Sequence, residues 1–308
     1  MSTKFKISSI VLFLTFFSSY LVAIENKILL KINNKIITTH DIYKESIYLS
    51  LLNEELKNFD KTKIDQISKN SIIKDIIKEN EIEKFYKKIK LDDTFLEEFL
   101  INYFKKFNIN TIDELKNKLK QNDLTIDYVK NKITIQLMWN ELIFKKFSNK
   151  IKINKYLIEE ELSKKKIQNE FLISEIVFNV NKKSELDKKY NLIQEEIKNQ
   201  NFSSAAIIHS TSETSVNGGR VGWIKENSLS TNIRNNLKNT NVGGITKPIQ
   251  IPGGFIILKI EDTREILLNL NTDKEIEIII KNKTNEQLKQ FSNIYFNKIK
   301  KDLNVSEL

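Results

Sequence analysis

The 308-residue chain has no cysteine, and it has only seven glycines and two prolines. Without a thiol, the chain cannot form a disulfide framework, a Cys-ligated zinc site, a catalytic thiolate or a lipid anchor on a processed cysteine. All seven glycines lie between Gly218 and Gly254, and Pro248 and Pro252 fall in the same window. Since these residue types give the backbone its special conformations, this one region needs its own explanation.

The net charge and the hydrophobic content are compatible with several classes of protein. Fifty basic residues against forty acidic ones give a formal net charge of +10. A solvated, lysine-rich surface accounts for this balance most simply, although acidic partners and anionic membranes would also suit it. No arginine-rich run with interleaved aromatic residues is present, so we expect no nucleic-acid partner. The length and the 40% hydrophobic content suffice for two modest domains with packed cores.

The first residues, "MSTKFKISSIVLFLTFFSSYLVA", have the layout of a secretory signal peptide. Lys4 and Lys6 precede an apolar run over Ile10–Phe17, and smaller and mixed residues follow. We therefore expect residues 1–23 to be a cleaved signal peptide and the mature protein to be periplasmic, where no ATP is available. The alternative is an inner-membrane anchor over residues 7–24, although two serines and a tyrosine interrupt its apolar run.

The next segment predicts a short strand pair followed by a helix. A turn is expected at Asn33-Asn34, and Thr38 or Thr39 can cap the helix, with Asp41 three residues after Thr38. The expected apolar face of this helix comprises Tyr43, Ile47, Tyr48, Leu51 and Leu52.

Residues 71–167 contain neither glycine nor proline and have a helical pattern nearly throughout. Thr111 and Glu114 form a capping box, and Thr125 can cap a longer helix that ends near Phe147. We expect residues 24–166 to form a helical N-terminal domain. One segment is crowded with aromatic residues, which serve either as core or as an apolar surface for unfolded chains: Phe95, Phe99, Tyr103, Phe104 and Phe107.

The pattern changes near Glu170. The pieces "EFLISEIVFNV" and "GGFIILKIED" predict strands, and helical pieces and the glycine-rich window lie between them. This order predicts a compact α+β domain over residues 167–264. Residues 265–308 predict a strand and then a helix, whose apolar stripe must dock on the N-terminal helices. The stripe comprises Leu288, Phe291, Tyr295 and Ile299.

The pieces "SEIVF", "NFSSAAIIHSTSETSVNGGRVGW" and "NVGGITKPIQIPGGFIILKIED" together resemble the parvulin family of peptidyl-prolyl cis-trans isomerases. The matching positions are Phe202, Ala205, Ser210, Gly218, Gly219, Gly222, Trp223, Gly243 or Gly244, Ile245, Pro248, Gly254, Phe255 and Ile257. A signal peptide, a helical unit, one parvulin domain and a lone C-terminal helix resemble the SurA-type periplasmic chaperones. This resemblance implies an α+β protein, with a mainly helical N-terminal chaperone module completed by the C-terminal helix and one parvulin-like α+β domain.

The family's pocket has two histidines, a Cys or Asp that faces the substrate, and an apolar cup for the proline ring. The resemblance places Glu175 and Ile256 at the histidine positions and Ser212 at or near the Cys/Asp position. His209 matches neither histidine position and is expected to be structural, and His40 is expected on the surface. The expected substrate-binding residues are Val221, Trp223, Ile224, Leu229, Ile233 and Phe255.

A pocket without its histidines is expected to accelerate proline isomerisation weakly or not at all. We therefore expect an ATP-independent periplasmic holdase for unfolded outer-membrane proteins or other exported polypeptides, with no cofactor and no metal. Two alternatives stay open. The first is an active isomerase that uses Ser212 in a remodelled pocket, and the second is a membrane-anchored foldase.

Overall fold

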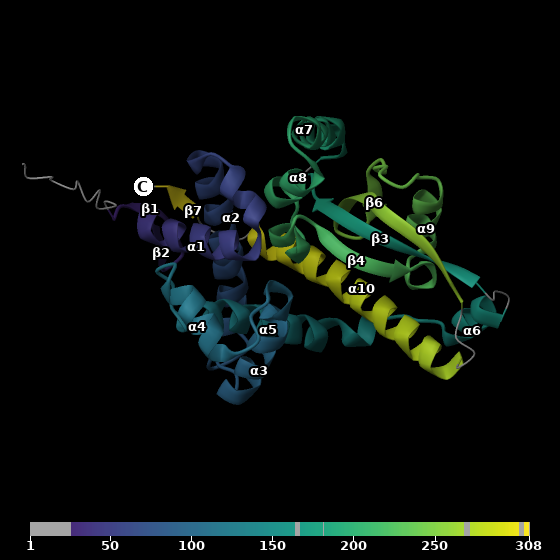
Figure 1. The fold of residues 1–308 in the computed structure, drawn as a ribbon, viewed down its shortest axis with the longest axis horizontal. Helices are drawn as coiled ribbons and strands as arrows, with labels where there is room; N and C mark the ends of the chain where they lie inside the picture. The colour runs from purple at the N-terminus through teal and green to yellow at the C-terminus, as the bar shows by residue number, and fades with distance from the viewer. Residues whose placement is uncertain (1–25, 164–166, 181, 268–271, 302–304, 308) are drawn as a thin grey trace, which may run out of the picture.

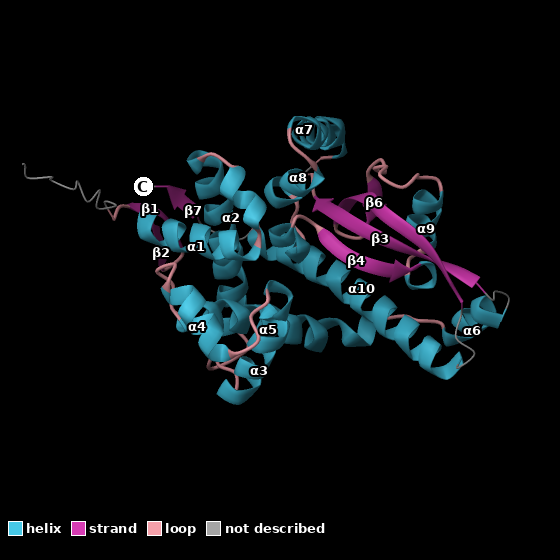
Figure 2. Cartoon of the chain, viewed as in Figure 1, coloured by secondary structure: helices cyan, strands magenta, loops and turns pink. Residues whose placement is uncertain are grey.

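The structure is a computed structural model that describes residues 26–163, 167–180, 182–267, 272–301 and 305–307. Its helices and strands are segregated: most helices gather on one side, and a four-stranded sheet lies on the other (Figure 2). We call residues 28–163 together with the C-terminal helix the helical unit, and residues 167–267 the sheet unit. The expected α+β fold, with a helical N-terminal part and one parvulin-like domain, is confirmed.

The helical unit consists of two short strands, six helices, the long C-terminal helix and a final strand (Figure 1). Their bounds are β1 Ile28–Ile32, β2 Lys35–Thr38, α1 Thr39–Leu52, α2 Lys61–Glu83, α3 Asp93–Phe104, α4 Ile112–Lys120, α5 Ile126–Phe147, α6 Lys155–Ser163, α10 Thr272–Lys300 and β7 Val305–Glu307. The sheet unit comprises β3 Ile167–Phe178, α7 Leu186–Asn199, α8 Phe202–His209, β4 Arg220–Lys225, α9 Thr231–Lys238, β5 Ile249–Ile251 and β6 Gly254–Leu267.

Side-chain caps begin three helices of the helical unit at the expected residues. Thr38 and Asp41 form a reciprocal capping box at α1, and Thr111 and Glu114 form another at α4. The Thr125 hydroxyl accepts from the Tyr128 amide at the start of α5. The expected inner face of α1 is partly wrong, because Tyr43 is exposed. The side chains that α1 buries are Ile42, Glu45, Tyr48, Leu49 and Leu52.

The sheet unit is an antiparallel sheet in the order β4-β3-β6-β5, covered by helices on both faces. Strands β3 and β6 pair along their whole length, from Ile167 opposite Leu267 to Phe178 opposite Phe255. Helices α7 and α8 pack on one face around Ile176. Helix α9 packs on the other face, where β3 and β6 contribute alternate residues to a second apolar cluster.

The segment after residue 264 differs from the expectation. The strand predicted there is the end of β6, since residues 265–267 continue its pairing with β3. A helix of 29 residues then begins at Thr272, well before the expected helix. Its first turns contain β-branched residues that favour strands in isolation, but Ile276 and Ile279 are buried against Ile158 and Leu162 of α6. Tertiary packing therefore overrides local propensity.

The C-terminal helix docks on the N-terminal helices, as its apolar stripe predicts. Leu288, Tyr295 and Ile299 of α10 pack against a buried cluster of α2 and α5 centred on Trp139. Strand β7, which the sequence did not suggest, pairs with β1, so the last described residues rejoin the first strands (Figure 1). The exact domain boundaries stay predictions.

No helix in the described part of the chain combines the length and apolar character that a bilayer crossing needs. The expected signal peptide at residues 1–23 and the alternative anchor at residues 7–24 lie outside the described residues.

Candidate functional site

The site begins with a carboxylate on β3. The Glu175 carboxylate accepts hydrogen bonds from the Ser212 hydroxyl at 2.6 Å and from the Thr214 hydroxyl at 2.9 Å. Glu175 is half-buried and Ser212 is buried. The structure therefore brings together two of the three positions that match the family's catalytic site. Both hydroxyls donate to the same carboxylate oxygen, Oε1.

The backbone around Glu175 explains why the glycines are needed. Ser212 and Thr214 lie at the 3-10 turn η5 (Glu213–Asn217), which ends at Gly218 and Gly219 with positive φ angles of 67° and 78°. The Gly219 carbonyl accepts from the Glu175 amide at 2.8 Å. A Cβ on Gly219 would lie 2.3 Å from the Glu175 carbonyl oxygen, so only glycine permits this approach.

The second histidine position is occupied by an apolar side chain in the core. Ile256 is 6% exposed and packs on the α9 face of the sheet. Leu229 and Ile233 of the expected cup are buried in the same cluster, and Val221 and Ile224 pack against its edge. These five side chains belong to one apolar layer on this face of the sheet.

Trp223 and Phe255 do not join this layer. Phe255 stacks on Phe178 at 5.8 Å in the cluster on the α7–α8 face. Trp223 is paired with Leu172, and the Arg264 guanidinium lies 4.1 Å from the centre of its ring. Because adjacent residues of a strand point to opposite faces, these two aromatic residues face away from the expected cup. Their assignment to substrate binding stays a prediction that the geometry does not favour.

Helix α10 contributes a second carboxylate near the site. Burial of Glu286 raises its pKa; Lys283 and Lys289 oppose this rise, and the charge of Glu175 adds to it. Lys283 also donates to the Leu229 carbonyl oxygen at 3.4 Å. No local pattern predicts that Glu286, more than a hundred residues after Glu175, lies near it.

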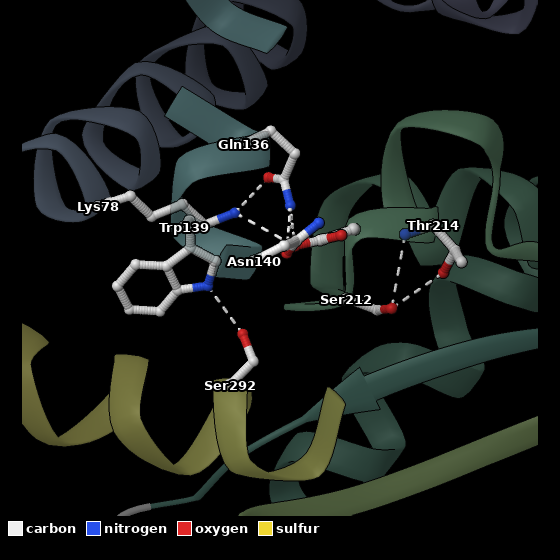
Figure 3. Close-up of polar contacts among 8 residues, drawn as sticks. Lys78, Gln136, Trp139, Asn140, Ser212, Thr214 and Ser292 are labelled. Carbon is white, nitrogen blue, oxygen red and sulfur yellow. Dashed lines mark hydrogen bonds and ion pairs between the residues drawn. The ribbon is translucent and has the colours of Figure 1, made fainter. Parts of the chain in front are cut away.

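The same turn that carries Ser212 and Thr214 contacts the helical unit. Lys78 of α2 points toward η5, where its Nζ lies 3.3 Å from a Glu213 carboxylate oxygen, and Gln136 of α5 also donates to Glu213 (Figure 3). Beside them, the Trp139 indole donates to the Ser292 hydroxyl of α10 at 2.8 Å. Ile207 at the end of α8 is buried in the core of the helical unit. The site therefore lies at the junction of the two units.

The two histidines lie away from catalytic positions. His40 is exposed at the start of α1. His209 is the last residue of α8, and its Nδ1 lies 3.3 Å from the Lys189 ammonium. Burial first and the Lys189 charge second lower the pKa of His209 to about 4, so its ring is neutral at pH 7.

His209 makes stability depend on pH. In the unfolded chain the imidazole takes up a proton near pH 6.5, whereas in the folded protein the pKa is about 4. Protonation therefore favours the unfolded state, and stability is lost as pH falls from 6.5. Between pH 6.5 and 5, the free energy of unfolding of the His209→Gln variant is expected to fall by roughly 1 kcal/mol less than that of the unaltered protein. This figure includes a reduction for solvent screening. Urea unfolding at several pH values measures this. His40→Gln is the matched control, and an equal effect of both substitutions would contradict the assignment.

A cavity of about 490 Å³ lies elsewhere in the sheet unit. Ser174, Arg220, Gly222, Lys259 and Glu261 line it, together with the start of α8 and Glu55 of the helical unit. Its charges are largely satisfied, because Lys259 pairs with Glu261 at 2.6 Å and the Ser174 hydroxyl donates to Glu261 at 2.9 Å. Among the described residues, no cluster of three or more His, Cys, Asp or Glu side chains is placed to hold a metal ion.

Comparison with known proteins agrees with this geometry. The profile of the rotamase family, the PPIC-type PPIASE domain, matches residues 172–262. Chaperone SurA of Pseudomonas putida is 26% identical over 165 residues, which cover 50% of this chain and 39% of that protein. Chaperone SurA of Escherichia coli O157:H7 is 25% identical over 187 residues, which cover 57% and 44%. Residues 172–262 therefore match the PPIC-type rotamase domain, and the chain is similar to SurA-type chaperones.

Two solved structures of this family align with most of the chain at low similarity. A peptidylprolyl isomerase, PrsA from Bacillus anthracis, is 19% identical and covers 75% of this chain and 96% of its own, with a TM-score of 0.32. A SurA-like chaperone of Campylobacter jejuni is 15% identical and covers 92% and 99%, with a TM-score of 0.35. The chain spans less than half the length of the curated SurA relatives that it matches.

Proposed function

We propose that this SurA-type protein is an ATP-independent periplasmic chaperone that holds unfolded outer-membrane proteins, and that its parvulin domain does not catalyse proline isomerisation. The claim that the domain does not catalyse isomerisation rests on the residues at the two histidine positions of the family, Glu175 and Ile256. Glu175 has its carboxylate bound by two hydroxyls, and Ile256 is buried in an apolar layer.

The chemistry of isomerisation supports the loss of catalysis. Rotation about a peptide bond has a barrier of roughly 20 kcal/mol, and an enzyme lowers it by stabilising a twisted, desolvated amide. Ile256 has no group that can hydrogen-bond to such an amide. Glu175 offers a negative charge that is already held by Ser212 and Thr214. The apolar layer can still contact a proline-containing segment, but it lacks polar groups that act on the rotating bond.

A row of aromatic rings on α3 supports the holdase half of the proposal. Phe95 and Phe99 have ring centres 6.4 Å apart, and Phe99 and Tyr103 are 6.3 Å apart. Phe95 is 50% exposed, and the Lys106 ammonium lies 4.6 Å from the centre of the Tyr103 ring. A row of rings that runs from the exposed Phe95 to the half-buried Phe99 and Tyr103 suits extended apolar segments, such as the unpaired strands of an unfolded β-barrel. Binding the unfolded state needs no energy source.

The test is aggregation of a urea-denatured outer-membrane β-barrel protein after dilution into buffer. We expect the mature protein to suppress light scattering at near-stoichiometric ratios. Phe95→Ser removes one exposed ring and its ring-ring contact, so we expect about 1 kcal/mol weaker binding and roughly fivefold more protein at half-suppression. Phe144→Ser is the matched control, because Phe144 is 53% exposed and has no ring partner among the described residues. Absence of suppression by the unaltered protein would refute the holdase.

A further inference from the structure

Helix α10 has two sides with different chemistry. One side is apolar and aromatic: Phe291 stacks on Phe147 at 5.1 Å, and Tyr295 stacks on Trp139 at 5.9 Å. The other side faces the sheet unit: α10 runs below β4 (Figure 1), and its main contact there is with the 3-10 turn at Glu226–Ser228. The first side belongs to the core of the helical unit, so α10 is firmly part of that unit. The second side is an interface between the two units.

The contacts of the second side are polar and follow the helix for most of its length. Near its start, Glu275 pairs with Lys225 of β4 at 2.6 Å. In the middle, the Asn282 amide donates to the Ser228 hydroxyl at 3.2 Å, and Lys283 donates to the Leu229 carbonyl oxygen. We call the contacts of Glu275, Asn282, Lys283 and Asn297 the seam.

The far end of the seam lies at the β5–β6 hairpin. The Asn297 amide donates to the Gly253 carbonyl oxygen at 3.4 Å. A Cβ on Gly253 would lie 2.9 Å from the Ile294 side chain, so α10 lies directly on the hairpin backbone. From Glu275 to Asn297 the helix rises about 33 Å, which is enough to span a small domain.

These contacts bracket the candidate site. Leu229, whose carbonyl Lys283 binds, belongs to the expected cup, and Gly253 lies at the turn that leads into Ile256. Between them, Glu286 is close enough for the charge of Glu175 to act on it. Helix α10 therefore lies over the parvulin domain at Leu229, beside Glu175 and at the turn that precedes Ile256.

We propose that α10 is an internal strap over the parvulin face, and that a proline-containing apolar polypeptide segment reaches this face only when the seam separates. The segment and α10 compete for one surface. The inference rests on the contacts of α10 and on the parvulin fold, and it holds whether or not the protein is a holdase.

The geometry of the chain permits such a separation. The sheet unit begins at Ile167 and ends at Leu267, and these two residues pair with each other at one end of the β3–β6 ribbon. Both connections to the helical unit therefore leave from the same place, about which the sheet unit can pivot. Further attachments between the units include the Ile207 contact, the Gln136–Glu213 hydrogen bond and the ion pairs Lys63–Glu196, Lys78–Glu213 and Arg234–Glu161. Opening breaks these contacts between the units, but it breaks no covalent bond and no strand pairing of the sheet.

The absence of cysteine makes a direct test possible. Ser228→Cys together with Asn282→Cys places two unique thiols at a contact across the seam, where oxidation locks α10 in place and a reductant releases it. The probe is the peptide Ala-Phe-Pro-Phe, and binding is followed by methyl NMR of Leu229, Ile233 and Ile256. We expect the reduced protein to bind at least tenfold more tightly than the oxidised protein.

A second variant tests the same proposal without an engineered disulfide. Lys283→Ala with Asn297→Ala removes two seam contacts without touching the apolar layer, and it is expected to bind the peptide several-fold more tightly than the unaltered protein. Lys281→Ala, exposed on the same helix, is the control and leaves binding unchanged. Equal binding by the oxidised and reduced pair, an unchanged seam variant, or no peptide binding by any of these proteins overturns the proposal.

Discussion

Replacing Trp139 with alanine is expected to lower the free energy of unfolding by about 4 kcal/mol. The indole is fully buried at the centre of the α5–α10 contact. Its ring stacks on Tyr295 at 5.9 Å and meets Phe296 edge-on at 6.4 Å. Truncation removes these contacts, leaves a cavity and deprives the Ser292 hydroxyl of its donor. Since α10 completes the helical unit, the loss affects the whole unit rather than one helix.

Urea unfolding followed by far-ultraviolet circular dichroism measures this effect. Trp223→Ala is the matched control, because Trp223 lies half-buried on β4 with Arg264 over its ring. The control is expected to lose less than half as much stability. A loss below about 1 kcal/mol for Trp139→Ala, or equal losses for both tryptophans, would show that α10 is not anchored through this residue.

The Lys132→Met substitution is expected to lower the free energy of unfolding by about 3–5 kcal/mol. Lys132 of α5 lies between two carboxylates, with its Nζ 2.7 Å from Glu45 and 2.5 Å from Asp75. Burial acts to lower the pKa of Lys132, but Asp75 and Glu45 outweigh it and hold the pKa above its usual value. Glu45 is completely buried. Removing the cation therefore leaves an uncompensated buried charge.

Two comparisons separate this charge effect from ordinary packing. Lys130→Met on the same helix breaks an ion pair with Glu97, which is partly exposed to solvent, and is expected to cost much less stability. Adding Glu45→Gln to Lys132→Met removes the buried negative charge and is expected to restore part of the loss. If the double variant is as unstable as the sum of the two single variants, the stranded charge is not the cause.

The sequence was sufficient to predict features that depend on residues close together in the chain. The capping boxes at Thr38 and Thr111 are local, and the close approach at Gly219 follows from the family's glycine pattern. It was insufficient to predict features that depend on contacts between segments far apart in the chain. Glu45 is polar and lies among apolar residues of α1, yet it is buried because Lys132, eighty-seven residues away, neutralises it.

The candidate site shows the same division. The positions of Glu175, Ser212 and Ile256 were predicted, and the first two are in contact. The partner hydroxyl of Thr214 and the nearby Glu286 were missed, because no local pattern marks them. Trp223 and Phe255 were predicted to bind substrate because they belong to the matching motifs. A motif match does not specify the face of a strand to which a residue points.

The most direct test of the central claim is the rate of cis-to-trans isomerisation of a proline tetrapeptide by the mature protein, measured on the preparation that suppresses aggregation. The account predicts a rate equal to the spontaneous rate at every protein concentration. The Glu175→His, Ile256→His variant, measured beside it, shows whether restored histidines add turnover. Clear turnover by the unaltered protein would contradict the account, because it would show that a parvulin pocket with Glu175 and Ile256 at its histidine positions still catalyses.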